Sequence, residues 1–152
     1  MELRPELSPP VIPSTRIEQL CAAIHTVVEL LESGADARAD IAAFNEDTGH
    51  TYEPYDFMTY GSWRNIEEFA LEAARPAWPK VPDVSREELV EIVRRIQIQA
   101  MDDDRDYYLL VLETNTVRPG VSDLIHWPPP HLVGASAEAI VDEALRYRPT
   151  AL

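Results

Sequence analysis

The stretch IEQLCAAIHTVVELLES, residues 17–33, decides the fold class. Its apolar side chains recur every three or four residues, which is the spacing of one face of an α-helix. They are Ile17, Leu20, Cys21, Ile24, Val27, Val28 and Leu31. Gly34 follows directly, and glycine is typical just beyond the end of a helix. The stretch therefore predicts a long amphipathic helix that buries one face against other elements.

Helical signals continue on the carboxyl side of this stretch. Ser62, Ser85 and Ser136 each precede a segment with helical spacing and are predicted as N-caps. Shorter helices are predicted through residues 36–49 and around residues 54–60, and VSDLIHW, residues 121–127, forms a short segment between breaks. The apolar run Tyr107 to Leu112 follows a group of aspartates that suit a helix start, so a helix is predicted there too. We predict an all-α protein of two small antiparallel four-helix units.

Prolines divide the chain into predicted domains. Residues 1–13 are proline-rich and have no amphipathic period, so they are predicted as an extended lead-in. An N-terminal helical unit covers residues 14–76, a proline-rich linker covers residues 77–84, and a second four-helix unit covers residues 85–152. Trp78 in the linker is large and apolar, so we expect it to pack between the two halves.

The two halves share an order of elements. Asp56–Tyr60 (DFMTY) and Asp123–Trp127 (DLIHW) match as aspartate, two apolar residues, any residue and an aromatic, at an offset of 67 positions. An Arg-Pro pair closes each half. Two interpretations stay open: a degenerate internal duplication, and a chance match between four-helix units of similar size.

Composition points to a protein-binding role. The chain has 152 residues, 45% of them hydrophobic, and carries 27 acidic against 13 basic side chains, a formal net charge of -14. This charge argues against binding nucleic acid or an anionic membrane and favours a basic partner. The sequence has no apolar run of the roughly 20 residues that a membrane-spanning helix needs, and the amino terminus is unlike a signal peptide. We therefore expect a cytoplasmic protein.

Catalytic patterns are weak. The four histidines are far apart in sequence, and the five glycines form neither a GxGxxG motif nor a P-loop. The acidic run Asp102 to Asp106 could attract a divalent cation, but aspartates before a helix more often cap its backbone N–H groups. We therefore predict no enzyme activity, no metal and no cofactor. Enzymatic use of a metal on this run is the third-ranked hypothesis.

One segment resembles a known family. RPGVSDLIHWP, residues 118–128, followed by the Ser136 cap and a helix, resembles the third-helix region of the immunity proteins of colicin and pyocin nucleases. Ser85–Val93 looks like the first helix of that family, and Asp104–Val117 stands at its acidic, variable second helix, so the resemblance covers about residues 83–149. It implies a four-helix bundle with a very short third helix, and an inhibitor without catalysis.

The resemblance also implies partner-binding residues. Asp123 and Trp127 would be the shared anchors, with His126 at the first of two positions where the family usually has tyrosines. The specificity-determining helix would supply Asp102, Arg105, Asp106, Leu109, Leu110 and Glu113. For Trp127 an alternative is that it closes the end of the bundle as a core residue.

These observations predict an immunity-type inhibitor that binds a basic nuclease domain of a bacteriocin or toxin, either a DNase or an RNase, and blocks its access to nucleic acid. It would contact neither nucleic acid nor membrane itself, and a homodimer through apolar patches is possible. The alternative is an acidic helical adaptor or DNA-mimicking regulator of a nucleic-acid-binding protein that is not a toxin.

Overall fold

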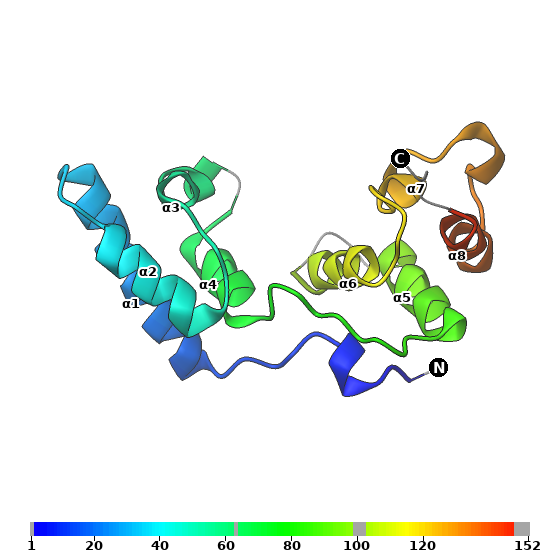
Figure 1. Ribbon diagram of the computed structural model, residues 1–152, viewed down its shortest axis with the longest axis horizontal. Helices are drawn as coiled ribbons and strands as arrows, with labels where there is room; N and C mark the ends of the chain where they lie inside the picture. The colour runs from blue at the N-terminus through cyan, green and yellow to red at the C-terminus, as the bar shows by residue number, and fades with distance from the viewer. Residues whose placement is uncertain (1, 63, 99–102, 148–152) are drawn as a thin grey trace, which may run out of the picture. The chain divides into compact units, whose positions relative to one another are not determined.

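The computed structural model describes residues 2–62, 64–98 and 103–147, and within these ranges every regular element is helical. The predicted all-α class is therefore confirmed. The chain divides into two compact units, Pro10–Ala77 and a second unit made of Met1–Pro9 together with Trp78–Leu152. The labelled helices α1 to α4 belong to the first of these units and α5 to α8 to the second, as Figure 1 shows by label and colour.

The N-terminal unit contains α1 (Ser14–Glu32), α2 (Arg38–Thr48), α3 (Pro54–Thr59), the 3-10 helix η2 (Tyr60–Ser62) and α4 (Ile66–Ala74). The predicted amphipathic helix is α1, which buries Leu20, Ile24 and Val27 and is followed by Gly34 at φ 77°. This helix packs chiefly against α4. The centre of the unit is aromatic, because Phe44, Phe57 and Phe69 meet there with ring centroids 5.4–6.3 Å apart.

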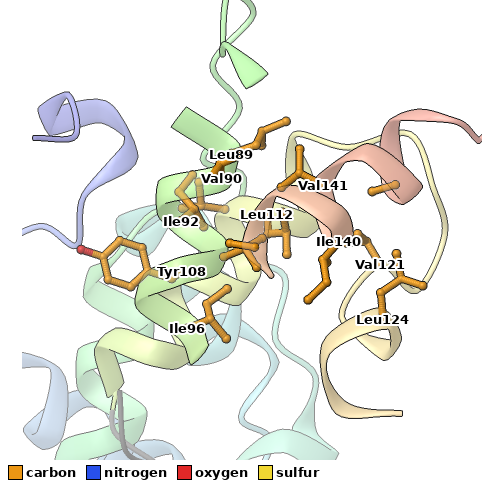
Figure 2. Close-up of a cluster of buried hydrophobic side chains, with 14 of the residues drawn as sticks. Leu89, Val90, Ile92, Ile96, Tyr108, Leu112, Val121, Leu124, Ile140 and Val141 are labelled. Carbon is orange, nitrogen blue, oxygen red and sulfur yellow. The ribbon is translucent and has the colours of Figure 1, made fainter. Parts of the chain in front are cut away.

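The C-terminal unit contains α5 (Arg86–Ile98), α6 (Asp103–Thr114), α7 (Asp123–His126), the 3-10 helix η3 (Pro130–Leu132) and α8 (Ala137–Leu145). Helix α5 packs against both α6 and α8 (Figure 1). Figure 2 shows side chains of these helices converging on one core, among them Ile92, Leu112 and Val141, each at most 1% exposed.

The amino-terminal segment forms part of the C-terminal unit. The 3-10 helix η1 (Pro5–Leu7) carries Leu7, which is fully buried, and Leu3 is 6% exposed in the same core. Arg4 donates hydrogen bonds to both carboxylate oxygens of Glu88, at 2.7 and 3.0 Å, and reaches Asp83 at 3.1 Å. The sequence predicts an extended lead-in here. Isolated leucines can fill a core without any helical period, so no local pattern indicates this packing.

The predicted caps Ser85 and Ser136 are confirmed. Ser85 Oγ accepts from the Glu88 backbone N–H at 3.1 Å, and Glu88 Oε1 accepts from the Ser85 backbone N–H at 2.9 Å. This reciprocal pair is a capping box. Ser136 Oγ accepts from the Ala139 backbone N–H at 3.2 Å.

The predicted cap at Ser62 is wrong. Ser62 lies in η2, and the cap of α4 is Asn65, whose side chain accepts from the Glu68 backbone N–H at 2.8 Å. Trp63, which directly follows Ser62, lies outside the described residues. An asparagine followed three residues later by a glutamate is itself a capping pattern, and it stops the helix from starting earlier.

The expectation that Trp78 packs between the halves is also wrong, because its side chain is 71% exposed. The proline-rich segment is held by its backbone. Asn115, after the end of α6, donates to the Pro79 carbonyl at 3.0 Å and accepts from the Val81 N–H at 2.8 Å. Both bonds are buried, so the segment is fixed to the C-terminal unit without help from the indole.

Candidate functional site

Helix α7 is a short helix held to its unit by two apolar side chains. Val121 and Leu124 are 1% and 3% exposed and lie in the core (Figure 2). The chain enters the helix through Gly120, whose φ of 63° favours glycine and whose carbonyl accepts from the Asp123 N–H at 2.9 Å. Asp123 and His126 are exposed on the helix. Asp123 and His126 are three residues apart, so they lie together on one exposed, polar face of α7.

Trp127 follows α7 directly and is 79% exposed. Its backbone N–H donates to the Asp123 carbonyl at 2.8 Å, so the residue is fixed by its main chain. The alternative that Trp127 closes the bundle as a core residue is therefore wrong. A tryptophan exposed to this degree offers a large apolar surface to another molecule.

A hydrogen bond joins the start of α6 to the end of α7. Arg105 Nη2 lies 2.9 Å from His126 Nε2, and Arg105 Nε donates to the Ile96 carbonyl at 3.2 Å. A guanidinium can only donate, so His126 Nε2 must accept and the proton of the neutral imidazole sits on Nδ1. The pair therefore fixes the tautomer of His126 and leaves Nδ1–H as a donor.

The same two side chains line a pocket of about 430 Å³ in the C-terminal unit. Its apolar lining includes Ile96, Leu124, Ile125, Leu132 and Ile140, and its polar lining includes Gln97, Arg105 and His126. The lining therefore presents polar and apolar surface in similar measure.

Exposed apolar residues stand next to this lining in the chain. Trp127 lies between the lining residues His126 and Pro128, and Val133, 71% exposed, lies between the lining residues Leu132 and Gly134. Ile98, 75% exposed, immediately follows Gln97. We call Ile98, Trp127 and Val133 the apolar rim.

The outward face of α6 carries most of the other predicted site residues. Asp106 and Glu113 are exposed two helical turns apart, and Leu110 between them is half-buried. Leu109 packs partly against the core. Asp102, also predicted to contact a partner, lies outside the described residues.

The apolar character of α6 has an explanation inside its own unit. Tyr107, Tyr108, Val111 and Leu112 are all at most 5% exposed. The Tyr108 hydroxyl accepts from Arg95 at 2.8 Å, and this bond is the main reason why the pKa of Arg95 is raised. The buried side of α6 thus serves the core, and Asp106 and Glu113 are exposed on its other side.

The structure brings together some of the predicted residues. Arg105 and His126 line one pocket, and Trp127 follows His126 in the chain, whereas Asp106, Leu110 and Glu113 follow the outer face of α6. Sequence reasoning missed Ile98 and Val133. The signal for Ile98 was present, because it is an apolar residue off the buried stripe of α5.

The described residues offer neither a metal-binding cluster nor a membrane-spanning helix. No group of three or more His, Cys, Asp and Glu side chains within them could hold a metal ion. No helix in this part of the chain has the length and apolarity needed to cross a bilayer.

No protein-family model, curated protein or solved structure matches the chain.

Proposed function

We propose that the chain is an immunity-type inhibitor, which acts in the cytoplasm by binding a basic nuclease domain of a bacteriocin or toxin and blocking its access to nucleic acid. The observation that carries the proposal is Trp127, held by its backbone at the end of α7 with 79% of its side chain exposed beside a pocket. The resemblance of residues 118–128 to nuclease immunity proteins gives the class of partner.

Trp127 and its surroundings have the make-up of an interface centre. Tryptophan is among the residues that contribute most to protein–protein affinity, especially where neighbouring contacts exclude water. Ile98 and Val133 are further exposed apolar residues next to the pocket lining in sequence, and the pocket can receive a side chain of the partner. Within it, Arg105 and His126 Nδ1–H are suited to bind an acceptor group of that side chain.

Charge supports a basic partner. The C-terminal unit holds 15 acidic and 9 basic residues, and the whole chain has a formal net charge of -14. Such a charge accelerates association with a basic protein and repels nucleic acid. A basic nuclease domain that binds here would meet carboxylates where its substrate offers phosphates.

The outer face of α6 is proposed to set which nuclease is bound. Asp106 and Glu113 can pair with cations of the partner, and Leu110 adds apolar contact between them. Asp102, Leu109 and Asp123 complete the proposed set. Because exposed charges act mainly on association rate and on discrimination, their loss should change specificity more than it changes stability.

A matched pair of tryptophan variants tests the proposal. Trp127→Ala should weaken the complex with a bacteriocin nuclease domain by about 2 kcal/mol or more, measured by titration calorimetry. Trp78→Ala is the control, because Trp78 belongs to the same unit, is 71% exposed and does not line the pocket. Both variants should keep their helical circular dichroism. Equal affinities for wild type and Trp127→Ala would remove Trp127 from the interface.

A further inference from the structure

The N-terminal unit repeats the helix order of the C-terminal unit. Each contains two longer helices, then a short helix and a medium helix: α1 to α4 in the first, and α5 to α8 in the second. In each unit the first helix packs against the last, α1 on α4 and α5 on α8, although α5 also packs extensively on α6 whereas α1 makes little contact with α2. The short helix is the third in both, so α3 occupies the place in its unit that α7 occupies in the other.

The correspondence extends to single residues of the short helices. At the offset of 67 positions, Phe57 of α3 matches Leu124 of α7, and both are buried in their own cores, at 1% and 3% exposure. The preceding residue is an aspartate in both units, Asp56 and Asp123. Each short helix is therefore fixed to its unit by the residue after that aspartate.

Helix α3 also presents an exposed apolar surface. Tyr55 is 73% exposed and Met58 is 51% exposed, and their spacing of three residues places them on one face of the helix. Tyr60, the match of Trp127, instead packs edge-on against Phe69 at 5.1 Å. Among the described residues of this unit, the exposed aromatic Tyr55 therefore comes from the first turn of the short helix.

We propose that Tyr55 and Met58 form a second docking surface, occupied by a second molecule of the same basic nuclease domain, so that one chain binds two nucleases. The inference rests on the proposed function of the C-terminal unit. Charge complementarity favours this occupant, because residues 10–77 hold 12 acidic against 4 basic residues, a formal charge of -8. The surface is also suited to such contact, since aromatic residues and methionine are enriched in interface centres.

The rim of this surface is acidic. Glu53, exposed, precedes α3, and Asp56 lies within it between Tyr55 and Met58 in sequence. Asp56 Oδ2 accepts from the Glu53 backbone N–H at 2.8 Å, which fixes the start of the helix. Two carboxylates therefore stand close in sequence to the exposed apolar pair Tyr55 and Met58.

Stoichiometry tests the inference. Native mass spectrometry of the full chain with an excess of a bacteriocin nuclease domain should show two nucleases per wild-type chain. The double variant Tyr55→Ala, Met58→Ala and the single variant Trp127→Ala should each show one, with the lost site weakened about 30-fold or more. Val11→Ala, 96% exposed in the same unit as α3, should keep two.

The contradicting outcomes are distinct. A one-to-one wild-type complex that Trp127→Ala abolishes would overturn the second surface and leave the proposed function standing. If the wild-type chain self-associates and the Tyr55→Ala, Met58→Ala variant does not, the surface joins two copies of this chain instead. That outcome also overturns the inference. Absence of any complex with wild type would overturn both proposals. Far-UV circular dichroism of each variant verifies that its helices are retained.

Discussion

The amino-terminal segment gives a prediction on stability. The sequence predicts an extended lead-in there, whereas the structure places Leu3 and Leu7 in the core of the C-terminal unit. We predict that Leu7→Ala destabilises the C-terminal unit by about 2–3 kcal/mol. Leu7 is fully buried, and truncation of a buried leucine to alanine costs roughly 2–5 kcal/mol. We expect a value in the lower part of that range.

Urea unfolding followed by far-UV circular dichroism measures this effect. With a denaturant slope of about 2 kcal/mol per molar for a small domain, the midpoint should fall by roughly 1 M or more. The control is Val11→Ala, whose side chain is 96% exposed and whose loss should change stability by less than about 0.5 kcal/mol. If Leu7→Ala and Val11→Ala shift the midpoint equally little, the segment does not belong to the core.

Two further predictions concern a titrating group and a turn. The hydrogen bond from Arg4 is the largest cause that holds the pKa of the Glu88 carboxyl below its ordinary value of 4.5. The contact between Arg4 and ionised Glu88 therefore stabilises the folded state above that pH, and this stabilisation is lost as the pH falls and Glu88 takes up a proton. The difference in urea midpoint between wild type and Arg4→Ala should therefore be large at pH 7 and narrow below about pH 4, whereas a constant difference would refute this cause. Gly120→Ala should cost about 1–2 kcal/mol, because φ is 63° and the new Cβ would lie 3.2 Å from an oxygen of Asp123. Gly61→Ala, with open space and no positive φ, is its thermal-unfolding control, and equal melting temperatures would contradict the expected strain.

Short-range signals account for what the sequence predicted of the fold. The stripe of α1, the capping box of Ser85 with Glu88 and the cap of Ser136 depend on residues within a few positions of one another. The error at Ser62 has the same origin, since two cap candidates stand three residues apart and Asn65 has the better-placed glutamate.

Long-range contacts account for what the sequence missed. Leu7 reaches a core formed by residues more than seventy positions away, and the bond between Arg105 and His126 spans 21 positions. Neither contact leaves a periodic pattern in the chain. Exposure is equally non-local, so tryptophans of similar sequence setting could not be assigned to core or surface beforehand, and Trp78 was predicted wrongly.

The most direct test of the central claim is a titration of nuclease activity. A basic bacteriocin nuclease domain is held at fixed concentration, the full chain is added in steps, and cleavage of nucleic acid is followed at low and at high salt. The account predicts that activity falls to background once binding is saturated, that high salt weakens the inhibition, and that Trp127→Ala inhibits far less than Trp78→Ala. Undiminished cleavage at a large excess of the chain, across a panel of such domains, would contradict the proposed inhibitor.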